Sequence, residues 1–228
     1  SNVDQSRITF LDFDENIETV RNYVNWKYRI SDNLTFVQGF HNMNVLLNDK
    51  NTFENRSALS WQINKSTKLN AGYGKHSMME SIHHYFTQFE DEKGNITRPN
   101  ADLGLIKADH FVLGIEKRVS SNIIFKLETY YQKLYNVPVA NNVENNFSTL
   151  NESLDFQYVD LVNKGTGRNY GVEITLERFF ENDYYYLINL SAFDSKFTPL
   201  DGIERDTRFN GKYIANFLAG KEFTNLGE

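Results

Sequence analysis

The feature that most constrains this chain is an alternation of apolar and polar residues that recurs along many long segments. A period of two places successive side chains on opposite faces of a β-strand. In the segment 18–30, for example, Trp26 and Tyr28 share one face while Lys27 points to the other. The same alternation runs through the segments that start at 34 and through 53–63, 68–77, 109–119, 123–135, 169–180, 184–197 and 211–223. The sequence therefore predicts an all-β protein.

Short polar turns and long polar connections follow one another between these segments. The short turns are 31–33, 64–67, 120–122 and 181–183, and they consist mainly of Asn, Asp, Ser, Lys and Glu. Asn and Asp tolerate the backbone angles that tight hairpins need. The long connections cover about 80–107, 137–168 and 198–210. We therefore predict an antiparallel up-and-down meander with tight turns at one end and long loops at the other.

Two architectures can carry such a meander. One is the wall of a transmembrane β-barrel, and the other is an extracellular β-sandwich that serves as a glycan-binding or adhesion module. Aromatic residues near the strand ends, such as Trp26, Phe180 and Tyr184, favour the barrel because amphipathic rings prefer the membrane interface. The alternation alone does not decide which face of the sheet points inward.

The composition narrows the range of possible functions. The mean hydropathy of -0.55 is compatible with a barrel, because a barrel exposes only every second residue to lipid. The chain of 228 residues has no cysteine, which excludes disulfides and thiolate chemistry. Its formal net charge of -6 argues against nucleic acid as a partner.

Several stretches resemble the barrel of TonB-dependent outer-membrane receptors. They are Asn163–Phe180, Thr207–Gly211, Ala219–Phe223, Gly72–Ser77 and the strand His110–Val119 that leads into Tyr130-Tyr131-Gln132. The resemblance implies a Gram-negative outer-membrane importer of an iron complex, a vitamin or an oligosaccharide. It implies a barrel of about 22 strands, contact with lipid, and contact with TonB through an N-terminal plug domain.

The extent of the chain differs from that complete pattern. We count about nine to ten strands, whereas single-chain bacterial barrels have an even number and this family needs more. We therefore expect residues 1–228 to form a single β-barrel segment that is incomplete at both ends and lacks the plug domain. Such a piece transports nothing alone.

The candidate ligand contacts lie in a cluster at the start of the first long loop. Its members are His76, Met78, Met79, His83, His84, Tyr85 and Phe86. Histidine and methionine can ligate soft metals, and aromatic residues can contact a siderophore or a sugar. We interpret the cluster as ligand contacts in an outer loop, and we predict neither a metal site nor a cofactor.

Two alternative readings of local motifs are rejected. His76 and Ser77 are neighbours in a strand and point to opposite faces, so they form no catalytic dyad, and we predict that the chain is not an enzyme. Gly165-Thr166-Gly167 is followed by a strand rather than by a helix, so we interpret it as a flexible loop end and not as a nucleotide loop.

Overall fold

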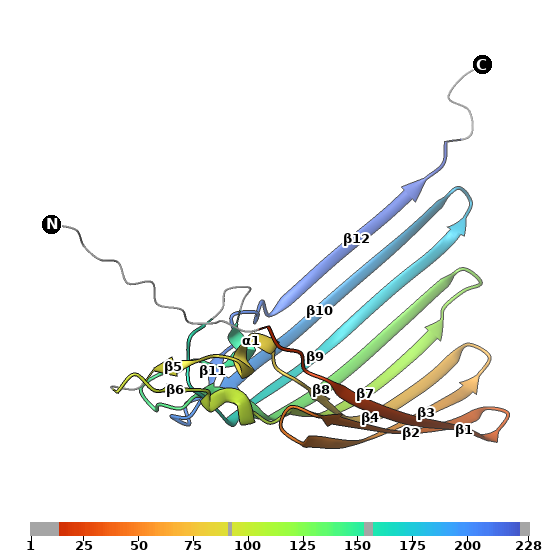
Figure 1. Cartoon of the computed structure of the whole chain (residues 1–228). Helices are drawn as coiled ribbons and strands as arrows, with labels where there is room; N and C mark the ends of the chain where they lie inside the picture. Colours follow the sequence, from red (N-terminus) through yellow and green to blue (C-terminus); the bar gives the residue numbers. More distant parts are fainter. Residues whose placement is uncertain (1–13, 91–92, 153–156, 224–228) are drawn as a thin grey trace.

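The protein is built around one antiparallel sheet whose strands follow one another in chain order (Figure 1). The computed structural model describes residues 14–90, 93–152 and 157–223. The order is β1-β2-β3-β4-β7-β8-β9-β10, and both β11 and β12 pair with β10. The long strands are β1 (Thr19–Ser31), β2 (Leu34–Val45), β3 (Lys50–Asn64), β4 (Thr67–Met78), β7 (Ile106–Arg118), β8 (Ile123–Ala140), β9 (Leu161–Glu181), β10 (Tyr184–Thr198) and β12 (Tyr213–Lys221).

The remaining elements are short and belong to the long connections. They are α1 (Ile82–Tyr85), β5 (Phe89–Glu90), β6 (Ile96–Thr97), the 3-10 helices η1 (Pro99–Asp102) and η2 (Thr149–Asn151), and β11 (Arg205–Asp206). In the described ranges no helix is long and apolar enough to cross a membrane. The predicted all-β meander is confirmed. No second large sheet packs face to face with the first in the part of the chain that the structure describes, so the β-sandwich alternative is wrong.

The predicted short turns join the strands at one end of the sheet. Between β9 and β10, Asn182 and Asp183 have φ angles of 53° and 68°. Two consecutive residues with positive φ are typical of a type I′ turn, whose twist matches that of the flanking strands. At the opposite end the connections are long, except that residues 46–49 join β2 to β3 directly.

Strands β8 and β9 extend further into the predicted loop 137–168 than we expected. They continue to pair through Val137↔Gly165 and Ala140↔Leu161 after an irregularity at Asn136, which has a φ of 55°. A Cβ atom on Gly165 would lie 2.3 Å from Val139 Cγ1 and 2.9 Å from the Val137 carbonyl oxygen. Glycine therefore permits close strand pairing here, and the interpretation of 165–167 as a flexible loop end is wrong.

One face of the sheet is apolar across many strands. Leu69, Ile115, Leu127, Ile174 and Leu190 are direct partners in register on neighbouring strands, so their side chains form one row. Nearer the long loops, the same face carries an aromatic row and then a charged row. The aromatic row is Tyr73, Phe111, Tyr131 and Tyr170, and the charged row is Lys75, Asp109, Lys133, Arg168 and Lys196. Apolar, aromatic and charged rows in this order are typical of a strand wall that leaves the lipid core.

The opposite face is polar and lies beneath the long loops. Its rows include His110, Gln132, Asn169 and Ser195, which are direct partners on β7, β8, β9 and β10. Further along this face, Ala108 and Leu134 are buried because Leu150 of η2 packs against them. The long loops therefore cover the polar face, which settles the orientation that alternation alone left open.

The neighbouring strand lies so close to Gly171 that a larger residue there should destabilise the sheet. A Cβ atom there would lie 2.8 Å from the Ala192 carbonyl oxygen, whereas one on Gly114 would meet nothing closer than 3.7 Å. In the full-length protein we expect Gly171→Ala to lower the free energy of unfolding in urea by about 1–3 kcal/mol, because backbone has to move. Gly114→Ala on the same face is the control, with an expected change within about 0.5 kcal/mol. Equal effects of the two changes would contradict this account.

Candidate functional site

The long connections fold together into one layer over the polar face. We call the described parts of residues 79–105, 141–160 and 199–212 the loop layer. Its largest core consists of Tyr85, Phe86, Leu103 and Leu161, with Ile17, Met79, Phe147 and Val159 packed around it. Arg208 also donates its backbone N–H to Asn151 Oδ1 at 2.9 Å, which links the third connection to the second. Figure 1 shows these short elements gathered at one end of the sheet.

Three asparagine side chains fasten the segment 99–104 to its surroundings. Asn48 Nδ2 donates to the carbonyl oxygens of Ala101 and Leu103, each at 3.0 Å. Asn100 is fully buried, donates to the Val159 carbonyl oxygen at 2.9 Å and accepts from the Leu161 N–H at 2.8 Å.

Asn163 completes this set from β9. Its amide accepts from the Gly104 N–H at 2.7 Å and donates to the Gly104 carbonyl oxygen at 3.1 Å. A primary amide offers one acceptor and two donors, so it can replace the backbone partner that a loop lacks. We call Asn48, Asn100 and Asn163 the asparagine clamps.

The predicted ligand contacts divide into two groups in the structure. His76 lies on β4, where its ring centroid is 6.1 Å from that of His110. Met78 ends the same strand and is exposed. Met79 packs against two of the buried clusters of the loop layer. The seven predicted residues therefore do not form one continuous surface.

Tyr85 and Phe86 are core residues of the loop layer. Their exposed fractions are 1% and 4%, respectively. Burial raises the pKa of Tyr85 to about 12. In this conformation neither ring can contact a ligand, and both instead anchor α1 and the residue that follows it.

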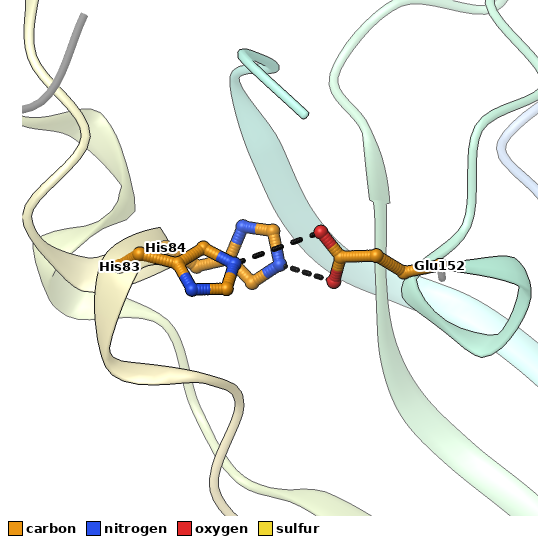
Figure 2. Close-up of side chains that lie close together, drawn as sticks. All are labelled: His83, His84 and Glu152. Carbon is orange, nitrogen blue, oxygen red and sulfur yellow. Dashed lines mark hydrogen bonds and ion pairs between the residues drawn. The ribbon is translucent and has the colours of Figure 1, made fainter. Parts of the chain in front are cut away.

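His83 and His84 do come together, with an acid that the sequence analysis did not select. His84 Nε2 lies 2.7 Å from Glu152 Oε2, and His83 Nε2 lies 3.6 Å from Glu152 Oε1. The two imidazole rings lie side by side, and the carboxylate faces both of them (Figure 2). His84 is fully buried. The sequence separation of 68 residues between His84 and Glu152 explains why no local motif could reveal the cluster.

The surroundings of this cluster are buried and acidic. Burial, and next the positive charge that His84 can carry, lowers the pKa of His83. Burial raises the pKa of Glu80, although a hydrogen bond from Thr149 opposes that rise. Thr149 Oγ1 donates to Glu80 Oε1 at 2.5 Å. Glu80 and Glu152 thus connect the same two loops.

A polar groove of 430 Å³ lies on the polar face of the sheet. Across it runs a chain of hydrogen bonds: Asn169 Nδ2 donates to Gln132 Oε1 at 2.8 Å, and Ser195 Oγ donates to Asn169 Oδ1 at 2.6 Å. The groove is lined by His110, Glu128, Tyr130, Gln132, Asn169, Glu173, Phe193, Ser195 and Phe209. Aromatic, amide and carboxylate groups that converge in this way can contact a polar ligand. None of the groove residues is among the predicted ligand contacts, although several of them lie in the stretches that resemble TonB-dependent receptors.

The hydroxyl of Ser77 is engaged with an acid rather than with a histidine. Ser77 Oγ donates to Glu54 Oε1, and the Ser77 N–H donates to the same atom at 2.9 Å. Glu54 is buried and also pairs with Arg56 Nη2 at 2.6 Å. These contacts fasten the end of β4 to Glu54 on β3.

A family model described as "TonB dependent receptor-like, beta-barrel" matches residues 2–223. A search of curated proteins found no match.

Solved structures with a similar fold include three importers or receptors. The ferric yersiniabactin uptake receptor FyuA from Yersinia pestis has a TM-score of 0.65 at 12% identity, with 92% of this chain and 32% of that chain covered. The siderophore receptor PirA from Pseudomonas aeruginosa has a TM-score of 0.60 at 14% identity, with 79% and 36% covered. The RagAB peptide transporter has a TM-score of 0.63 at 13% identity, with 82% and 23% covered. This chain therefore spans about a third or less of the length of these proteins.

Proposed function

The chain belongs to the TonB-dependent receptor β-barrel family, and on that premise we propose that it forms part of the barrel wall of an outer-membrane importer. TonB-dependent receptors reside in the outer membrane of Gram-negative bacteria. The apolar, aromatic and charged rows of the sheet support insertion into that membrane with the long loops directed outward and the short turns directed to the periplasm.

One observation carries the proposal: the loop layer folds over the polar face, so a polar groove lies beneath it. In a closed barrel that face would line the lumen, and a ligand arriving from outside would meet the loop layer first. Residues 1–228 would supply one barrel segment. The remaining strands and a plug domain that contacts TonB would come from other parts of the protein.

We propose that the imported ligand is an iron complex, a vitamin or an oligosaccharide. Among these, the names of the similar siderophore receptors favour an iron complex, and the amide, hydroxyl and carboxylate groups of the groove suit a polar cargo. Of the predicted contacts, Met78 is exposed and His83 is partly exposed, so these two side chains remain accessible to a ligand. The proposal includes no enzymatic step.

Uptake measurements test this function. In the bacterium that encodes the chain, deletion of the gene is expected to abolish uptake of one class of radiolabelled ligand from a panel of iron complexes, vitamins and oligosaccharides. Deletion of TonB should abolish the same uptake, because import is energised through it. The control is complementation with the intact gene. The proposal would be refuted if the gene deletion left uptake of every ligand in the panel unchanged. It would also be refuted if the affected uptake persisted without TonB.

A further inference from the structure

The cluster of His83, His84 and Glu152 brings three potential metal ligands together where two long loops meet. One ligand atom from each residue lies within 4.8 Å of the other two. We propose that this cluster binds a divalent transition metal, with Zn²⁺ the best match, and that the metal fastens the two loops to each other. The inference goes beyond nutrient import and stands without it, because it concerns the loop layer itself.

The present distances need only a small adjustment to admit the metal. Zinc binds histidine nitrogen at about 2.0–2.1 Å and carboxylate oxygen at about 2.0–2.2 Å, so two of its tetrahedral ligands lie about 3.4 Å apart. The observed separations from Glu152 are 2.7 Å to His84 and 3.6 Å to His83. The two distances end at different oxygens of Glu152, and the ligand atoms of the two histidines lie within 4.8 Å of each other. Each of these separations is therefore within about 1.5 Å of the value that a shared zinc requires.

The ligand types and their setting fit zinc. Two imidazoles and one carboxylate are a set of three protein ligands that zinc accepts, and a tetrahedral zinc would take its fourth ligand from water. Glu80 lies behind the cluster and receives a hydrogen bond from Thr149, three residues before Glu152. This hydrogen bond joins the same two loops as the cluster and helps to hold Glu152 near the histidines. The His83 side chain is 28% exposed while that of His84 is fully buried, so an ion can enter from the His83 side.

The position of the ligands favours a fastening role. His83 and His84 belong to α1 in the first long loop, and Glu152 follows η2 in the second. A metal held by both loops closes a chain segment of 68 residues. The entropy of closing a loop of that length is large, so a metal clip there restricts the chain strongly. Tyr85, the next residue, already sits in the core of the loop layer.

Zinc titration of the full-length protein in detergent, after treatment with a chelator, tests the site. Calorimetry should show one high-affinity Zn²⁺ per chain. Glu152→Gln keeps the size of the side chain and should weaken zinc binding by at least about tenfold, because the anionic ligand is lost. The matched control is the double change His76→Gln and His110→Gln, which removes the other close histidine pair and should leave the affinity unchanged.

A second readout follows the loops directly. Zinc should slow tryptic cleavage after Lys93, which lies in the first long loop, and this protection should be absent in Glu152→Gln. If Glu152→Gln does not assemble, His83→Gln serves in its place, since His83 is partly exposed. The proposal would be overturned if the protein bound no stoichiometric zinc, or if an assembled Glu152→Gln or His83→Gln variant kept the original zinc affinity. Loss of zinc binding in the His76/His110 control would also overturn it. None of these outcomes depends on uptake of a nutrient.

Discussion

Replacing Leu113 or Ile174 by arginine is expected to prevent the full-length protein from accumulating in the outer membrane. Both residues lie on the apolar face, in rows that continue across β4, β7, β8, β9 and β10. An arginine that faces lipid near the midplane of a barrel costs about 2–4 kcal/mol. Two such changes together would remove a large fraction of the stability of a typical domain. Membrane fractionation and the heat-dependent mobility of the folded barrel on gels measure the effect.

The control for this prediction is Asn189→Arg on the polar face. Asn189 is the direct partner of Thr175 and alternates with Leu190, so its side chain points away from the apolar row. An arginine there remains in a polar environment, and assembly should proceed normally. If Asn189→Arg blocked assembly while Leu113→Arg and Ile174→Arg did not, the two faces would have been assigned the wrong way round.

Replacing Asn100 by leucine is expected to loosen the loop layer. The two side chains have the same branched shape, but leucine replaces the amide with larger methyl groups and removes both hydrogen bonds to the chain at Val159 and Leu161. Each buried backbone group left without a partner costs about 1–3 kcal/mol. Hydrogen exchange of the Leu161 amide should accelerate by roughly tenfold or more, because local opening becomes easier.

Asn51→Leu provides the comparison for Asn100→Leu. Asn51 is exposed and lies two residues beyond the β2–β3 connection, close in sequence to the clamp at Asn48. Water solvates this exposed amide in the folded and in the unfolded protein, so hydrogen exchange of the Leu161 amide should not change. Equal acceleration in both variants would show that the asparagine clamps do not hold the segment 99–104.

The sheet could be predicted from the sequence because the pattern that specifies each strand lies within that strand. Alternation with a period of two identifies strands and their faces from neighbouring residues, and Asn182-Asp183 specifies a tight hairpin by its own backbone preferences. The predicted end of β8 was wrong because the pairing there depends on residues that are far apart in the sequence. Gly165 belongs to the strand only because Val137 and Val139 lie opposite it.

The loop layer could not be predicted in the same way. Glu152 meets His83 and His84 only after two loops have folded over the polar face. Tyr85 and Phe86 resemble exposed ligand contacts in the sequence, yet they become the core that positions those histidines. The sequence shows that the loops are rich in asparagine. Which backbone groups these amides bind depends on which segments lie side by side in the fold.

The asparagine clamps also determine how the loop layer responds to salt and acidity. Amide groups carry no charge, so their hydrogen bonds do not titrate with acidity and are not screened by dissolved salt, whereas exposed ion pairs weaken as ionic strength rises. Asn48, Asn100 and Asn163 hold the segment 99–104 through such neutral contacts. The attachment of this segment through amides should therefore vary little with salt or acidity, whereas the ion pair of Lys50 with Asp102 should weaken as salt is added.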